Sequence, residues 1–157
     1  STIVEKSDSF DEDALLLLVK CHMRKKFIKY SEINKYIDML EKHGKNEETI
    51  YVVSEFYLDW STNIKTQNFE SDSIKEIERK TAYKDKAHKV ILLLDNINKA
   101  NRQNDRYYYL LANANFNIWN NKAALSYIEQ ALIYSKESNP FRTRYQYLKN
   151  LIKEKMY

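Results

Sequence analysis

Four side chains in this sequence are thiols or imidazoles, the groups that most often act as nucleophiles, bases or soft metal ligands: Cys21, His22, His43 and His88. Cys21 and His22 are neighbours, and successive helical residues point about 100° apart, so the two cannot act on each other. The Glu-x-x-His and His-x-x-x-His spacings of helix-borne metal sites do not occur. A cysteine–histidine pair brought together by the fold is the one catalytic alternative left. We therefore predict that the chain is not an enzyme and needs no cofactor, with Cys21 as a small core residue.

A second candidate for chemistry is a basic segment at residues 20–29, whose candidate patch is Lys20, Arg24, Lys25 and Lys29. Such cations could bind phosphate groups or an acidic partner. Cations are also favourable near the C-terminal end of a helix, which explains them without any ligand. The net charge of +4 is mild, with both signs interspersed. We therefore keep nucleic-acid binding through basic helices as an alternative and do not expect nucleic acid as the main partner.

The elements that must position these residues are helices. The chain has one glycine and one proline among 157 residues, where average usage gives about 11 and about 8. This scarcity of turn-formers excludes a Gly-rich phosphate loop and an all-β fold. No apolar run approaches the roughly 18 residues of a membrane span. One cysteine fits a reducing compartment, so we expect a cytoplasmic protein.

Apolar stripes at helical spacing predict an all-α fold of about seven antiparallel helices. Ser9 to Glu12 resembles a capping box, and Gly44 is predicted to end the second helix in a left-handed conformation. The segment 74–100 fits either one helix or two with a break near Thr81. Asn139 and Pro140 are predicted as the cap and first residue of the last helix. The predicted helices cover about 10–29, 31–43, 47–64, 74–100, 106–118, 121–132 and 140–156.

The domain organisation expected from this pattern is simple. Residues 1–8 are polar and are expected to fray, and residues 9–157 are expected to form one helical domain. Because the sequence lacks an initiator methionine, this domain can be a fragment of a longer chain.

Residues 108–132 resemble the tetratricopeptide repeat, a helical hairpin of about 34 residues. Leu111-Ala-Asn113-Ala is similar to the Leu-Gly-Asn-Ala of the first repeat helix, and the run from Ala124 to Leu132 is similar to the second helix. Ala87 begins a related pattern 37 residues before Ala124. Trp119 stands where the family has its turn glycine. The resemblance implies stacked helical hairpins, with an irregular helical bundle as the alternative.

The same resemblance implies a site, because the first helix of each repeat lines a concave groove. Asparagine suits this position, since its amide can pair with a peptide backbone through both donor and acceptor. We therefore expect a non-catalytic scaffold or adaptor domain that binds a protein or peptide. A peptide-sensing regulatory domain of a signalling or transcription regulator is the alternative. The residues expected to face the groove are Arg106, Tyr109, Asn113, Phe116 and Asn117.

The last helix raises the question of self-association. It carries basic residues and a wide apolar face, which could cap the stack or dock on a partner. We therefore keep a homo-oligomer formed through residues 141–156 as an alternative. The apolar face comprises Phe141, Tyr145, Leu148, Leu151, Ile152 and Met156, and the basic residues are Arg142, Arg144, Lys149, Lys153 and Lys155.

Overall fold

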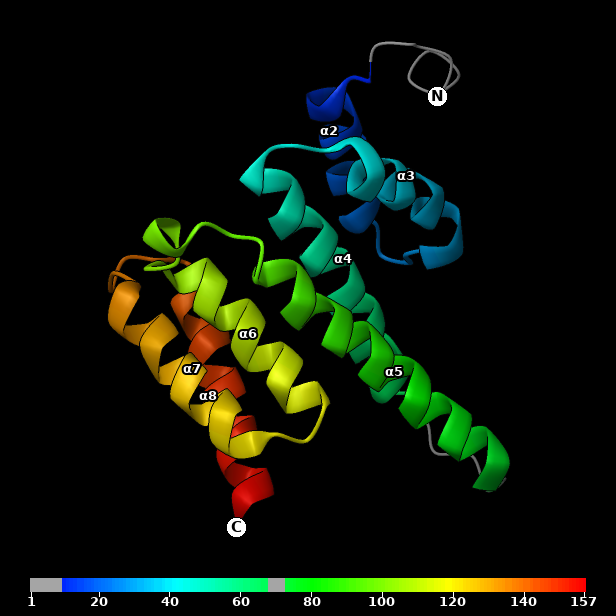
Figure 1. Ribbon diagram of the computed structural model, residues 1–157. Helices are drawn as coiled ribbons and strands as arrows, with labels where there is room; N and C mark the ends of the chain where they lie inside the picture. The colour runs from blue at the N-terminus through cyan, green and yellow to red at the C-terminus, as the bar shows by residue number, and fades with distance from the viewer. Residues whose placement is uncertain (1–9, 68–72) are drawn as a thin grey trace. The chain divides into compact units, whose positions relative to one another are not determined.

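The protein is helical throughout the residues that the computed structural model describes, 10–67 and 73–157 (Figure 1). No strand occurs within these ranges. This confirms the predicted all-α fold of seven helices. A single turn of 3-10 helix, Lys99–Asn101, follows the longest helix. The helices are α2 (Glu12–Met23), α3 (Tyr30–His43), α4 (Glu47–Lys65), α5 (Ser73–Leu94), α6 (Asp105–Asn117), α7 (Asn121–Tyr134) and α8 (Arg142–Met156).

The helices group into two compact units, Ser1–Phe56 and Tyr57–Tyr157. The boundary falls inside α4. That residues 9–157 form one domain stays a prediction, and the expected fraying of residues 1–8 lies outside the described residues.

The carboxylate of Glu12 connects two helices of the first unit, α2 and α4. Asp11, not the predicted Ser9, is the N-cap of α2, because its Oδ1 accepts from the N–H of Ala14 at 3.0 Å. Ser9 lies outside the described residues. Glu12 then turns away from its own helix and accepts from the N–H groups of Lys45 (2.9 Å) and Asn46 (3.0 Å) and from the Thr49 hydroxyl. A side chain of α2 thus caps the start of α4.

The ionised form of Glu12 is the one that this arrangement stabilises. Burial, the largest single influence, acts to raise its pKa, but the hydrogen bonds from Thr49, Asn46 and Lys45 together hold the pKa below its ordinary value. The contact is therefore strongest above the carboxylate's pKa and weakens as the pH falls through it.

Gly44 ends α3 for a reason other than the predicted one. Its φ of −68° and ψ of 142° are extended, so the left-handed stop is wrong. A Cβ at this position would lie 2.5 Å from the carbonyl oxygen of Leu40 and 2.6 Å from Cγ2 of Thr49. Gly44 is needed because the chain passes too close to these atoms for any side chain.

The first helix is shorter than predicted. It ends at Met23 instead of residue 29, with Arg24 as its C-cap. Its buried residues stop at Val19, and Phe27 is 78% exposed. No buried side chain therefore holds the basic segment in a helix, and short helices depend on such packing.

In the second unit, α5 runs unbroken from Ser73 to Leu94, which decides for one helix, although this helix ends before the predicted residue 100. There is no break near Thr81. The helix keeps one buried stripe despite its polar middle, and this continuous stripe favours a single helix. The buried residues are Glu76, Tyr83, Ala87, Val90 and Leu94.

Small residues let the following helices approach closely. Ala112 on α6 and Ala124 and Ala131 on α7 are all fully buried. This agrees with the close helix approach expected of Ala124 and Ala131 from the repeat pattern. The ring of Tyr108 stacks on that of Tyr134, with centroids 5.5 Å apart.

The last helix begins at Arg142, two residues later than predicted. Asn139 caps the turn before it, accepting from the N–H of Phe141 at 2.9 Å, so Pro140 precedes the helix and does not begin it. The predicted apolar face divides into three groups: Tyr145, Leu148 and Ile152 are buried, Leu151 is half-buried, and Phe141 and Met156 are exposed. Self-association through residues 141–156 stays a prediction.

Replacing Gly44 by alanine tests the close approach. We expect Gly44→Ala to lower the free energy of unfolding by about 1–3 kcal/mol, because the new methyl group overlaps Leu40 and Thr49. Urea unfolding of both variants would measure it, with Lys42→Ala as the control at an exposed position in the last turn of α3. A loss no larger than that of the control would contradict the assignment.

Candidate functional site

Helix α6 lies between α4 and α8, and the three helices run in the same direction. At its start, the Tyr145 hydroxyl of α8 donates to Asp105 at 2.6 Å. One turn on, the rings of Tyr109 and Tyr145 have centroids 5.0 Å apart. At its end, Asn117 bonds to residues in the last two turns of α4. The exposed and half-buried residues between these two ends are the candidate site, and we call it the α6 face: Lys65, Tyr109, Asn113, Phe116, Arg144 and Lys155.

Two of the predicted residues form the centre of the α6 face. Asn113 donates through Nδ2 to the Tyr109 hydroxyl at 3.4 Å, and both side chains are half-buried. Burial raises the pKa of Tyr109, so its hydroxyl stays protonated and can both donate and accept. This pair gives α6 an aromatic surface next to an amide.

Of the other three predicted residues, only Phe116 belongs to the α6 face. Arg106 is half-buried in the first turn of α6, and Phe116 is half-buried at its end. Asn117 is only 1% exposed. Its Nδ2 donates to the hydroxyls of Ser61 (3.1 Å) and Thr62 (3.0 Å), so its amide joins α6 to α4 and is not available to a peptide.

Lys65 is the residue of this site that the sequence did not indicate. It is the last residue of α4 and donates to the carbonyl oxygen of Phe116 (3.3 Å) and to Oδ1 of Asn117 (3.4 Å). Its Nζ lies 3.8 Å from the centroid of the Phe116 ring and 5.5 Å from that of Trp119. Burial, together with the charge of Lys155, lowers the pKa of Lys65 to about 8. A lone lysine at a helix end carries no spacing signal, so the pattern could not single it out.

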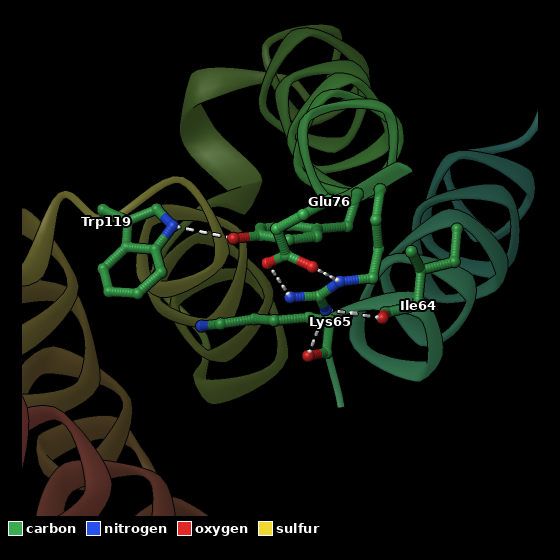
Figure 2. A network of polar contacts seen from close by, with 6 residues as sticks. Ile64, Lys65, Glu76 and Trp119 are labelled. Carbon is green, nitrogen blue, oxygen red and sulfur yellow. Dashed lines mark hydrogen bonds and ion pairs between the residues drawn. The ribbon is translucent and has the colours of Figure 1, made fainter. Parts of the chain in front are cut away.

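The end of α4 is held in place by an ion pair on α5 (Figure 2). Arg79 binds both carboxylate oxygens of Glu76, at 2.9 and 2.6 Å. The same guanidinium donates to the carbonyl oxygens of Ile64 (3.1 Å) and Lys65 (2.9 Å). Both carbonyls belong to the last turn of α4, and that of Ile64 also accepts from the N–H of Gln67 at 3.3 Å. The Glu76–Arg79 pair therefore fixes the backbone from which the Lys65 side chain extends.

Trp119 closes the site on the side of the α6–α7 turn. Its backbone has a φ of 67°, the left-handed region that favours glycine, and it is the only such non-glycine residue in the described ranges. Its indole N–H donates to the Tyr83 hydroxyl at 2.9 Å (Figure 2). Trp119, at the position that resembles the turn glycine, thus has the left-handed backbone that a glycine there would have. Its indole ring lies beside Lys65.

The predicted basic patch lies in the first unit and is partly neutralised. Lys20 pairs with Glu48 at 3.0 Å and Lys29 with Glu32 at 3.8 Å. Arg24 and Lys25 are exposed. A hollow of about 110 Å³ beside the patch is lined by His22, Lys25, Phe27, Lys29, Glu32 and Ile33.

The thiol and imidazoles give no assembled site in the described ranges. Cys21 is exposed, so its predicted place in the core is wrong. The reason is that the helix turns Leu15, Leu16 and Val19 inward instead. His22 stacks on the ring of Tyr36, with centroids 6.1 Å apart. Among the described residues, no three side chains of His, Cys, Asp or Glu gather as a metal site would need.

No protein-family model, no curated protein and no solved structure matches this chain. In the described ranges, no helix combines the length and the apolar character that crossing a membrane would need.

The buried ammonium of Lys65 gives a pH-dependent prediction. Between pH 8 and 10.5 the unfolded chain holds this proton more tightly than the folded one, so the free energy of unfolding gains from this group as the pH rises. We expect Lys65→Met to be most stable relative to wild type near pH 7, with the difference shrinking towards pH 10.5. Urea unfolding at several pH values would measure it. The control Lys80→Met removes an exposed lysine of α5, and a parallel pH trend in that control would contradict the prediction.

The left-handed backbone of Trp119 gives a second prediction. Trp119→Ala and Trp119→Gly both lose the indole, but only alanine keeps a Cβ that opposes a positive φ. We expect the glycine variant to be the more stable of the two by about 1 kcal/mol. Thermal or urea unfolding would compare them, and an alanine variant as stable as the glycine variant would exclude the left-handed conformation.

Proposed function

We propose that this chain is a non-catalytic scaffold domain that binds a protein or peptide segment across the α6 face. Asn113 is the observation that carries the proposal. Its only side-chain hydrogen bond within the described residues is the 3.4 Å contact to Tyr109, and its side-chain oxygen accepts none there. A half-buried amide with spare donor and acceptor capacity is suited to pair with a peptide backbone.

The arrangement of helices supports this reading. In the second unit, α4, α6 and α8 run in one direction while α5 and α7 return between them, as expected of helical hairpins stacked in a row. Such stacking places the first helix of each hairpin on a shared surface, which is the binding surface of helical-repeat proteins. The tetratricopeptide-like pattern of residues 108–132 agrees with this assignment and remains part of the proposal.

The α6 face offers the contacts that an interface needs. Tyr109 and Phe116 present half-buried aromatic surface, and aromatic residues are enriched at binding hot spots. Arg144 and Lys155 add positive charge from α8. Affinity would come from the rings, and the amide of Asn113 would orient the bound backbone.

Nucleic-acid binding through the basic patch is the weaker candidate. Lys20 and Lys29 each pair with a glutamate, which leaves Arg24 and Lys25 as the exposed cations of the predicted set. Phosphate contacts by two side chains give a shallow salt dependence and low affinity. A peptide-sensing regulatory domain would use the same α6 face, so it is a special case of the proposal.

The test is peptide selection followed by mutation of the α6 face. Peptides would be selected from a random displayed library on the wild-type protein, and their Kd measured by fluorescence anisotropy. We expect Tyr109→Ala and Asn113→Ala each to weaken binding about tenfold or more, because they remove an aromatic anchor and the backbone-pairing amide.

Ser126→Ala provides the matched control, since it removes an exposed polar group on α7, away from the α6 face. Circular dichroism and urea unfolding would verify that all three variants fold. If the selected peptides bind both α6 variants as tightly as the control, the α6 face is not the binding surface.

A further inference from the structure

The hollow beside the basic patch is a cavity that the proposed function leaves unused. It lies between the end of α2 and the start of α3, and all of its lining residues belong to the first unit. Its volume of about 110 Å³ is enough for several water molecules, so a group the size of a phosphate fits in it. The lining residues are His22, Lys25, Phe27, Lys29, Glu32 and Ile33.

The early end of α2 creates this hollow. In a helix continued to residue 29, as the sequence predicts, Lys25 and Phe27 would point about 200° apart and could not line one cavity. Because α2 ends at Met23, the chain turns instead, and the N–H of Lys25 donates to the carbonyl oxygen of His22 at 3.3 Å. The turn therefore brings side chains together that a helix would separate.

Three of the lining side chains offer N–H donors to an anion. Lys25 is exposed, and Lys29 is the N-cap residue of α3. The Nζ of Lys29 lies 3.8 Å from Glu32, which is longer than a hydrogen bond, so its ammonium group can still donate to a ligand. The imidazole of His22 is oriented by stacking on the ring of Tyr36. A few such donors are enough for one phosphate group, whereas a nucleic-acid strand needs a cation for each phosphate that it binds.

Phe27 gives the hollow a flat apolar wall. It is 78% exposed although it is a large aromatic residue. The Nζ of Lys26 lies 5.6 Å from the centroid of its ring, which places a further cation beside it. A ring next to cations is suited to a nucleotide, because the base stacks on the ring while the phosphate meets the cations.

Glu32 distinguishes a nucleotide from a simple anion. Its carboxylate also lines the hollow, and it would repel a phosphate placed next to it. A carboxylate does accept hydrogen bonds from the exocyclic amino groups of nucleobases, as glutamate does from cytosine. The lining therefore suits a ligand that has an amino-bearing base as well as a phosphate.

We infer that this hollow binds a nucleoside monophosphate whose base carries an amino group. The phosphate is bound by Lys25, Lys29 and His22, the base stacks on Phe27, and the amino group donates to Glu32. Every residue of this site belongs to the first unit, so the site and the α6 face can be tested separately.

The probe is cytidine monophosphate, titrated into isotope-labelled protein and followed by NMR, with the Kd taken from the amide shift changes. We expect Lys25→Gln, Lys29→Gln and Phe27→Ala each to weaken binding about fivefold or more, because each removes one of the contacts to the phosphate or the base. Phe27→Tyr keeps a ring and should change Kd by less than twofold. All three positions are exposed, so the variants are expected to fold.

The matched control is Lys42→Gln, which removes the same charge from an exposed position in the last turn of α3. It should change Kd by less than twofold. Equal effects of Lys42→Gln and of the two lysine variants at the hollow would overturn the inference, because the net charge would then explain the binding.

Other ligands identify what the site recognises. Uridine monophosphate has a keto group in place of the amino group, and cytidine lacks the phosphate, so both are expected to bind several times more weakly. If either binds as tightly as cytidine monophosphate, the assignment is wrong. Inorganic phosphate or phosphotyrosine with the same affinity would likewise overturn it, in favour of a simple anion or a modified peptide. Tighter binding of a phosphorylated cytidylate hexamer would assign the hollow to a nucleic-acid strand instead.

Exchange of Glu32 tests the contact to the base. A glutamine amide accepts from an amino group and also donates to a keto oxygen. We therefore expect Glu32→Gln to bind cytidine monophosphate and uridine monophosphate with nearly equal Kd. A preference as large as that of the wild type would show that the carboxylate does not contact the base, and the assignment of the base would be wrong.

Discussion

The buried amide of Asn117 is the interaction on which the second unit depends. Its donors are satisfied by Ser61 and Thr62 and its acceptor by Lys65, so the side chain fixes α6 against α4 at one register. Ser61 passes the connection on, since its hydroxyl donates to the carbonyl oxygen of Tyr83 on α5 at 2.6 Å. A buried amide without these partners would cost several kcal/mol, about 2–7, so any shift of one helix along another is penalised. This contact therefore fixes the position of the exposed side of α6, where Asn113 lies one turn earlier in the helix.

The same contact explains why an ammonium group is retained at a half-buried position. Lys65 completes the hydrogen bonding of Asn117 and is in turn steadied by Arg79, which binds the backbone carbonyl of Lys65. The backbone carbonyl of Lys65 thus accepts from a second cation, Arg79, which is itself paired with Glu76. Lys65 bonds to neutral oxygens within the described ranges, whereas Arg79 and Glu76 form a structural ion pair.

Helix existence could be predicted from the sequence because it depends on local periodicity, as the buried stripe of α5 and the buried Ala124 and Ala131 illustrate. The predictions that were wrong or missing concern side chains whose partners are far away in the sequence. The capping pattern predicts that Glu12 serves the start of its own helix, whereas its partners are more than thirty residues later. Asn117 and Lys65 are 52 residues apart, and nothing in the spacing of either predicts that they meet. The position of Asn113 on the α6 face was predicted through the repeat pattern, whereas the fate of Asn117 required the packing of α4.

The Trp119 indole beside Lys65 also gives the candidate site a fluorescence signal in solution. The chain has two tryptophans. Trp119 is 51% exposed and has the Lys65 ammonium 5.5 Å from its ring, whereas Trp60 is half-buried and has Lys86 over its ring at 4.2 Å. Indole emission responds to the polarity around the ring and to nearby charge. Replacing Trp60 by phenylalanine would leave Trp119 as the single tryptophan, and its signal would then report directly on events at the end of α4. The protein therefore carries an optical probe at this position, without any added label.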